Sequence, residues 1–299
     1  MPELPEVETI RRGLEKVIVG KEIGAIDLLL PRAFLGRVDD VLGAKVESIK
    51  RRAKVLCLCL SGDKNLLFHL KMTGQLIYRQ RPEAEGRRPG DIAGGHPSHD
   101  WHANLPNAQT RLAINFADGS KLFFNDLRMF GWCKVLSDAE IEKVFKEYGP
   151  EPLQSSGDLK QTRKAFTVEY LVNQAKRLPK RKIKQFLTDQ VIIAGIGNIY
   201  ADEILFAARI SPLRKASDIS LSEWQEVHDN TRAILDLAIK HRGTTDSDYV
   251  DAEGRSGGMQ DYLKIYRRTG EKCPAGCGGA IKRIAVSGRG THYCPACQH

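Results

Sequence analysis

The stretch Met1-Pro2-Glu3-Leu4-Pro5-Glu6-Val7-Glu8 opens the chain, and the residues after it decide how that opening is held. Apolar residues follow at helical spacing: Val7, Ile10, Leu14 and Val17. With Gly20 as a stop signal, this spacing predicts an amphipathic helix from Glu6 to Ile18. A packed helix would fix the chain terminus in place, as a positioned reactive group requires.

The terminus itself offers chemistry. Pro2 is small enough for an aminopeptidase to remove Met1, and the mature chain would then begin with a secondary amine. An α-amino group has a pKa of about 7.7, so much of it is unprotonated near neutral pH. Such an amine is a candidate Schiff-base nucleophile, and Glu3 is a candidate proton shuttle beside it. On these residues alone, the favoured interpretation is an ordinary start with glutamates that favour a helix N-terminus, and only the rest of the chain reverses this preference.

The composition points to a polyanionic partner. The 299 residues suggest two domains with a small appendage, and the net charge of +9 favours nucleic acid first and an acidic membrane surface second. A solvated basic surface without a partner is the alternative. Because no apolar run is long enough to span a membrane or to act as a leader, we expect a cytoplasmic protein with reduced cysteines.

Residues 21–136 have the texture of β-structure. The expected strands are Val46–Ile49, Val55–Leu60, Leu66–Leu70, Leu112–Phe116 and Lys121–Phe124. Gly62-Asp63 and Asp118-Gly119 are typical of hairpin turns. Cysteines in this half are expected in the core: Cys57, Cys59 and Cys133. Residues 81–107 lack periodicity and predict a long surface loop, in which His96, His99 and His102 are solvated rather than metal-bound.

The second half changes to helices. Ser137 and Glu140 predict a capping box for a helix that ends at Tyr148, and Ser220 and Glu223 predict another. The further expected helices are Val168–Arg177, Lys180–Gln190, Tyr200–Ala208 and Leu221–Lys240. Because strands precede helices, we predict an α+β chain in separate domains: a β-sandwich over 1–136, a linker over 137–165, a helical domain over 166–262 and a metal module over 263–299.

The cysteines of that last module are Cys273, Cys277, Cys294 and Cys297, two pairs separated by sixteen residues. Four thiolates at this spacing suit one tetrahedral zinc ion. Residues 261–299 also carry a surplus of five positive charges, which would face phosphates. A structural zinc knot with incidental charge is the simpler alternative, and a disulfide pair is the weakest one.

Three further motifs carry candidate ligands for nucleic acid. Gly195-Ile196-Gly197-Asn198 predicts a turn before a helix, where backbone N–H groups can hold a phosphate, although glycines required only for packing explain such a turn equally well. His69–Gly74 places Met72 at a strand end, and Asp126–Gly131 places Arg128 and Phe130 two residues apart. Such side chains wedge between bases or contact an exposed base edge. Taken singly, Met72 and Phe130 favour a place in the core over a contact with DNA.

Together, Met1–Glu8, His69–Gly74, Asp126–Gly131, Gly195–Tyr200 and the cysteine module resemble bacterial formamidopyrimidine-DNA glycosylase, in that order and across nearly the whole chain. The resemblance implies a β-sandwich, a helix–two-turns–helix domain and a zinc finger with one structural Zn²⁺. It also implies a monomer that binds double-stranded DNA, excises 8-oxoguanine and formamidopyrimidines, and then cuts the strand by β,δ-elimination. No membrane partner is implied.

The resemblance implies roles for individual residues. Pro2 would attack C1′ and form the Schiff base, Glu3 would protonate the opening sugar, and Lys54 would contact the lesion's phosphate. The remaining implied DNA contacts are Met72, Arg128 and Phe130 in the gap left by the flipped base, with Arg128 on the widowed cytosine, and Asn198 and Arg289 on phosphates. Thr244–Asp261 resembles the region that covers an everted base.

Some positions depart from the family pattern. Gln109 and Arg111 stand where two histidines often occur, and Arg242-Gly243 replaces a usual Gly-Gly. These departures affect the predicted base preference more than the chemistry. Two other functions therefore stay open at this point: a glycosylase for oxidised pyrimidines, and a non-catalytic DNA-binding protein with a zinc ribbon.

Overall fold

The structure is a computed structural model that describes residues 2–80, 92–95, 104–153, 159, 165–244 and 257–299. The chain divides into two compact units, and each is considered by itself. The first comprises residues 1–146, 156–159 and 239–260, and the second comprises 147–155, 160–238 and 261–299. The segment after residue 238 thus returns to the unit that contains the N-terminus.

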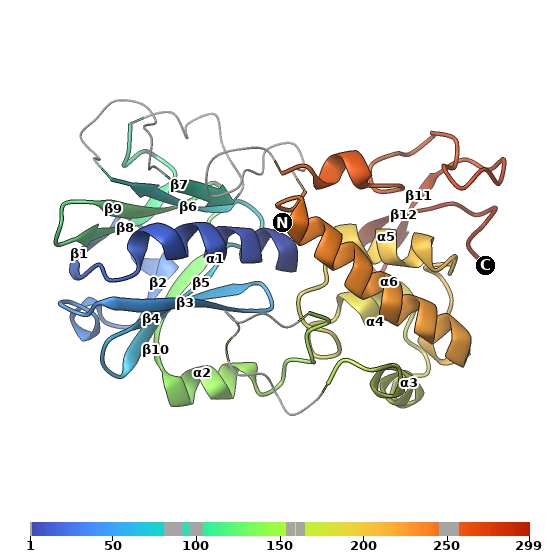
Figure 1. Cartoon of the computed structure of the whole chain (residues 1–299), viewed down its shortest axis with the longest axis horizontal. Helices are drawn as coiled ribbons and strands as arrows, with labels where there is room; N and C mark the ends of the chain where they lie inside the picture. Colours follow the sequence, from blue (N-terminus) through green and yellow to red (C-terminus); the bar gives the residue numbers. More distant parts are fainter. Residues whose placement is uncertain (1, 81–91, 96–103, 154–158, 160–164, 245–256) are drawn as a thin grey trace. The chain divides into compact units, whose positions relative to one another are not determined.

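Two five-stranded sheets form the first unit (Figure 1). The first sheet has the order β1-β8-β9-β6-β7, with strands Ile23–Leu28, Thr110–Phe116, Lys121–Asp126, Gly74–Arg79 and Ile92–Gly95. The second has the order β2-β10-β5-β4-β3, with strands Phe34–Leu35, Trp132–Ser137, Lys64–His69, Val55–Leu60 and Val46–Arg52. Phe68 of β5 meets Phe124 of β9 edge-on, with ring centroids 5.7 Å apart, so the core lies between the sheets.

Helix α1 (Leu4–Ile18) packs its apolar face on strands of both sheets, and Val7, Ile10 and Leu14 are buried in the same core. The predicted helix and both predicted hairpins are confirmed; Gly62 and Gly119 have φ of +103° and +86°. Cys57 and Cys133 are core residues as expected, whereas Cys59 is half-buried. Helix α2 (Asp138–Phe145) begins with the predicted capping box, in which Ser137 N–H donates to Glu140 Oε2 over 2.8 Å.

The second unit contains helices and a hairpin. Its elements are α3 (Val168–Arg177), α4 (Ile183–Thr188), α5 (Asn198–Ala207), most of α6 (Leu221–Lys240), β11 (Lys282–Val286) and β12 (Arg289–Tyr293). Trp224 of α6 packs on Phe186 of α4, and α5 contacts both α4 and β12. The mixed α+β prediction is confirmed. Among the described residues, no helix has the length and apolar character needed to cross a bilayer.

Three predicted elements were wrong in extent. Residues 81–107 contain β7, which pairs with β6 from Tyr78↔Ile92 to Gln75↔Gly95. Periodicity missed this strand because it ends in two glycines; a Cβ on Gly94 would lie 2.5 Å from Ile10 Cγ1 of α1. The three loop histidines lie outside the described residues.

The other two corrections concern helix ends. The helix predicted from Lys180 starts only at Ile183, because extended Lys182 forms a β-bridge with Lys215. Helix α2 ends at Phe145 rather than Tyr148. The chain must leave the helix there to bring Gly149 against the α4–α5 turn, where its N–H donates to Gln190 O over 2.9 Å.

Candidate active site and nucleic-acid surface

The start of α1 is buried and tied to a distant segment. Pro2 is buried, and the Glu3 side chain is 2% exposed. Glu6 Oε2 accepts the N–H of Glu3 over 2.8 Å, and Glu6 Oε1 accepts the N–H of Thr244 over 2.8 Å. Gly243 has φ +79°, and a Cβ there would lie 2.7 Å from Glu6 Oε1, so glycine is required. Glu6 therefore joins the candidate nucleophile's helix to the segment after α6.

Lys54 lies in the turn between β3 and β4, and an arginine connects this turn to α1. The turn includes Ala53 at φ +54°, and Lys54 is 5% exposed. Arg51 donates from NH1 to Ala53 O and from Nε to Glu8 Oε2, each over 3.1 Å. The turn that carries Lys54 is thereby joined to α1 by a buried ion pair.

Glu8 is the centre of that connection. Its side chain is fully buried and accepts hydrogen bonds from three arginines: Arg11, Arg12 and Arg51. Burial alone would raise the pKa of Glu8, but the hydrogen bond from Arg11 and the charge of Arg51 lower it overall. Sequence analysis missed this role. Helical spacing signals the bonds to Arg11 and Arg12, but only the fold brings Arg51 to the same carboxylate.

His69 shows that Lys54 and the Met72 segment lie near one another. His69 pairs with Val55, the residue after Lys54, across β5 and β4. Its burial, followed by the positive charges of Lys71 and Lys54, lowers the pKa of His69 to about 3. The neutral ring accepts the N–H of Lys71 at Nδ1 over 3.0 Å, so it acts here as a turn-forming acceptor.

Met72, Arg128 and Phe130 form one exposed cluster, which we call the wedge cluster. Arg128 NH1 contacts Met72 Sδ at 3.0 Å, and the guanidinium lies 4.9 Å from the centre of the Phe130 ring. Met72 is 41% exposed and Phe130 is 54% exposed, so the core alternative for these residues was wrong. Two apolar side chains that a basic group draws together on a surface are suited to contact with stacked bases.

Buried polar contacts underneath fix the two turns of the wedge cluster. Thr73 donates its hydroxyl to Asp126 and accepts the N–H of Arg128 over 2.9 Å. Asp126 Oδ2 also accepts the N–H of Gly131 over 2.6 Å. Arg111, one of the departures from the family pattern, donates from Nε to Asp126 O over 2.8 Å. Arg111 therefore supports the turn that carries Arg128.

In the second unit, Asn198 and Arg289 lie beside a polar hollow. Asn198 begins α5, and its Nδ2 donates to Gly290 O over 2.8 Å, next to Arg289 on β12. Arg289 is exposed and lines a hollow of about 460 Å³ together with Arg181, Lys184 and Gln190. Gln190 shapes the adjacent turn because its Nε2 donates to Ile196 O and its Oε1 accepts from Gly195 N, each over 2.8 Å.

A buried ionic network holds this hollow together. Lys184 is paired with Asp202 and donates from Nζ to Asn198 O over 2.8 Å. The other oxygen of Asp202 accepts the N–H of His292 over 2.9 Å. Helices α4 and α5 and strand β12 therefore meet at one carboxylate, which places Asn198 and Arg289 on the same side of the unit.

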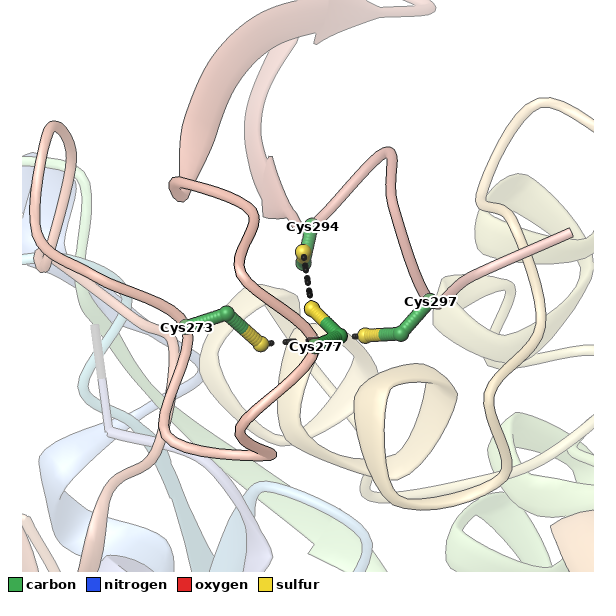
Figure 2. Close-up of side chains that lie close together, drawn as sticks. All are labelled: Cys273, Cys277, Cys294 and Cys297. Atoms are coloured by element: carbon green, nitrogen blue, oxygen red, sulfur yellow. Dashed lines mark hydrogen bonds between the residues drawn. The ribbon is translucent and has the colours of Figure 1, made fainter.

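The four predicted metal ligands converge (Figure 2). Their ligand atoms lie within 4.8 Å of one another; the Sγ atoms of Cys273 and Cys297 are 3.7 Å apart, and those of Cys277 and Cys294 are 3.5 Å apart. A tetrahedral ion with thiolates at ~2.3 Å would hold sulfurs about 3.8 Å apart, so the residues fit such an ion. Cys294 directly follows β12, and the cluster therefore fixes the base of the strand that carries Arg289.

Comparison with known proteins matches both units. The formamidopyrimidine-DNA glycosylase N-terminal domain matches residues 1–133, the H2TH domain of that enzyme matches 149–249, and a zinc finger found in FPG and IleRS matches 270–299. The chain belongs to the formamidopyrimidine-DNA glycosylase family.

Whole-length relatives agree with this family. Formamidopyrimidine-DNA glycosylases from Desulforamulus reducens and Carboxydothermus hydrogenoformans are each 40% identical over 100% of this chain and over 99% and 100% of their own lengths. Among solved structures, a Lactococcus lactis FPG mutant in complex with DNA that contains Fapy-dG has a TM-score of 0.82 at 34% identity and full coverage of both chains. The L. lactis Fpg complex with abasic-site DNA has a TM-score of 0.81 at 34% identity, covering 99% of each chain.

Proposed function

We propose that this protein removes oxidised purines from double-stranded DNA through a Schiff base on Pro2 and then cuts the strand by β,δ-elimination. As a member of its family, the chain is a DNA glycosylase of base excision repair. The residue roles and the purine preference are our proposal. They follow from the motifs and from the positions of the candidate residues in each unit.

The proposal rests on the hydrogen bonds that fix the N-terminal end of α1 in place. Pro2 and Glu3 are buried beside a carboxylate that binds the backbone at both Glu3 and Thr244. After removal of Met1, the Pro2 amine would attack C1′ of the damaged nucleotide, and Glu3 would protonate the ring oxygen O4′ as the C1′–O4′ bond breaks. The bond between C1′ and the base would then break, and the base would leave with that electron pair and the proton from the Pro2 nitrogen, so that an iminium remains. The iminium acidifies the C2′ hydrogens, so strand cleavage needs no metal. Lys54 would hold the phosphate next to the lesion.

The wedge cluster supplies what such a reaction needs from the duplex. Attack on C1′ requires the nucleotide to leave the stack, and unstacking costs a few kcal/mol. Met72 and Phe130 would occupy the vacated space, and Arg128 would donate to the widowed cytosine. Their exposure together, on turns fixed by Asp126, supports this role.

The second unit would grip phosphates. Arg289 lines the hollow described above together with Arg181, and Asn198 donates to the carbonyl of Gly290, next to Arg289. We infer that one Zn²⁺ is bound by Cys273, Cys277, Cys294 and Cys297, because four thiolates at these separations suit zinc. Bound there, the ion would fix the β11–β12 hairpin and so position Arg289, without contact with the reacting atoms. Action on chromosomal DNA would place the enzyme in the cytoplasm at the nucleoid. We expect it to act as a monomer.

Borohydride trapping tests the proposal. The mature enzyme is incubated with a duplex that contains 8-oxoguanine opposite cytosine, and the adduct is mapped by mass spectrometry. We expect a covalent bond to the nitrogen of Pro2, and loss of both trapping and strand cleavage in Pro2→Gly. An adduct on an internal lysine, or near-normal cleavage by Pro2→Gly, would contradict the proposed nucleophile.

A comparison of duplexes that contain 8-oxoguanine or thymine glycol separates the alternative functions. Faster excision of thymine glycol than of 8-oxoguanine in matched sequences would assign the enzyme to oxidised pyrimidines. Tight binding of both lesions without any adduct would instead indicate a non-catalytic DNA-binding protein. A gel-filtration run at the assay concentration determines whether the active species is a monomer.

A further inference from the structure

A second basic hollow lies within the first unit, on the outer side of α1. Its volume is about 290 Å³, and its lining residues are Thr9, Arg12, Gly13, Lys16, Ile239, Lys240 and Arg242. Among the residues that the structure describes, four of the lining side chains are cationic and none is acidic. The roles proposed above for the lesion and its flanking phosphates do not use this hollow.

Two residues of the hollow are costly choices for their local backbone. Arg242 has φ +63°, a left-handed conformation in which glycine is preferred and a residue with a side chain is strained. Gly13 lies inside α1, where glycine is less favourable than alanine. Arg242 adds a guanidinium group to the hollow, and Gly13 leaves its wall without a side chain at that position.

The charges around the hollow favour a polyanion. Arg12 gives its Nε–H to Glu8 over 2.8 Å, so part of its charge is neutralised by a buried carboxylate. Lys16 and Lys240 are exposed, and Arg242 is half-buried. Guanidinium groups bind phosphate oxygens in pairs, whereas lysines act as point charges. The combination matches a phosphate group better than a single carboxylate.

We propose that this hollow is a phosphate-binding site separate from the lesion site, with Arg242 as its principal ligand. The ligand is a phosphate group carried either by a small phosphorylated molecule or by the backbone of DNA. The proposal does not depend on Pro2 chemistry and stands or falls by binding measurements alone.

Inorganic pyrophosphate is the probe, and Arg209→Gly is the matched control. Arg209 is an exposed arginine at φ +56° in the second unit, so its replacement removes the same charge and the same backbone strain elsewhere. Titration calorimetry is carried out in an Arg289→Ala background, which weakens the other basic hollow. We expect Arg242→Gly to weaken pyrophosphate binding about fivefold and Arg209→Gly to leave it unchanged.

Melting temperature without ligand controls for folding. Both glycine variants should be at least as stable as the parent, because glycine relieves a left-handed φ. The proposal would be overturned if the Arg289→Ala parent did not bind pyrophosphate. It would also be overturned if Arg242→Gly and Arg209→Gly weakened pyrophosphate binding equally.

Undamaged duplex DNA then identifies the source of the phosphate. If Arg242→Gly weakens duplex binding by the same factor as pyrophosphate binding, the ligand is a DNA phosphate. If Arg242→Gly binds the duplex as tightly as Arg209→Gly does but binds pyrophosphate more weakly, the ligand is a small phosphorylated molecule.

Discussion

Each unit contains a buried glutamate that joins distant segments, but the two glutamates have different partners. Glu8 in the first unit accepts only from arginine side chains, and its pKa is lowered despite burial. Glu203 in the second unit accepts three backbone N–H groups, those of Lys264, Ile265 and Tyr266, over 2.8–3.0 Å. Burial is the largest influence on the pKa of Glu203 and raises it, although the backbone bonds act in the opposite direction.

The difference between Glu8 and Glu203 shows how arginine side chains and backbone N–H groups each stabilise a buried carboxylate. Guanidinium groups carry full charge and compensate a buried carboxylate, whereas amide dipoles satisfy its lone pairs without cancelling its charge. The first unit thus joins α1 to the turn that carries Lys54 through charge. The second unit holds its hairpin module through a backbone-bound carboxylate and the cysteine cluster. Four predictions test this contrast.

Removal of the metal should have the largest effect and should be confined to the second unit. Structural zinc contributes on the order of 10 kcal/mol to small zinc modules. We expect Cys294→Ser to lose one equivalent of zinc and the hydrogen-exchange protection of residues 282–293, while peptides from the first unit keep theirs. Cys59→Ser, outside the cluster, is the control. Full zinc content in Cys294→Ser would contradict the assigned ligand set.

Glu8→Ala should destabilise the first unit by about 3–5 kcal/mol, because it removes the buried carboxylate that compensates the charges of Arg11 and Arg51. Urea unfolding measures the loss. Glu15→Ala provides the control, since Glu15 also pairs with Arg11, at 2.9 Å, but is 45% exposed; that change should cost less than about 1 kcal/mol. Equal losses in both variants would show that burial of the Glu8 pair does not matter.

Glu203→Gln should cost less, about 1–3 kcal/mol, because the amide keeps one acceptor oxygen and no buried cation is left behind. The amide NH₂ can no longer accept from one of the three backbone groups. Hydrogen exchange should therefore quicken at residues 264–266 before it changes elsewhere in the second unit. Unaltered exchange at these amides would mean that the carboxylate is not what orders the segment.

Local patterns predicted much of this molecule. Helix α1, strand β4 and helices α3 and α6 follow from apolar spacing and capping residues, because those signals are contained within each segment. The cysteine cluster follows from ligand spacing. Strand β7 could not be predicted in this way, since its ladder partner and the helix above it determine its conformation.

The candidate site shows the same division. Met72, Arg128 and Phe130 are recognisable by type, but their exposure as one cluster depends on the bond between Thr73 and Asp126, which are 53 residues apart. The Glu8–Arg51 pair spans 43 residues. Sequence patterns thus indicate the candidate site residues, whereas the buried contacts that position them arise only in the folded chain.

The smallest expected effect is a difference in pH dependence between the two glutamates. The folded-state pKa of Glu8 is lowered from 4.5, so its stabilising contribution is present above that value and is lost as the pH falls through the folded pKa. The folded-state pKa of Glu203 is raised from 4.5, so its contribution is present at lower pH and is lost as the pH rises through the folded pKa. Between about pH 3 and about pH 7, the stability difference between wild type and Glu8→Gln should therefore widen as the pH rises toward 4.5, whereas that between wild type and Glu203→Gln should narrow as the pH rises above 4.5. Unfolding free energies of the three proteins across this range provide the measurement, and slopes of the same sign would remove the proposed distinction between arginine-bound and backbone-bound carboxylates.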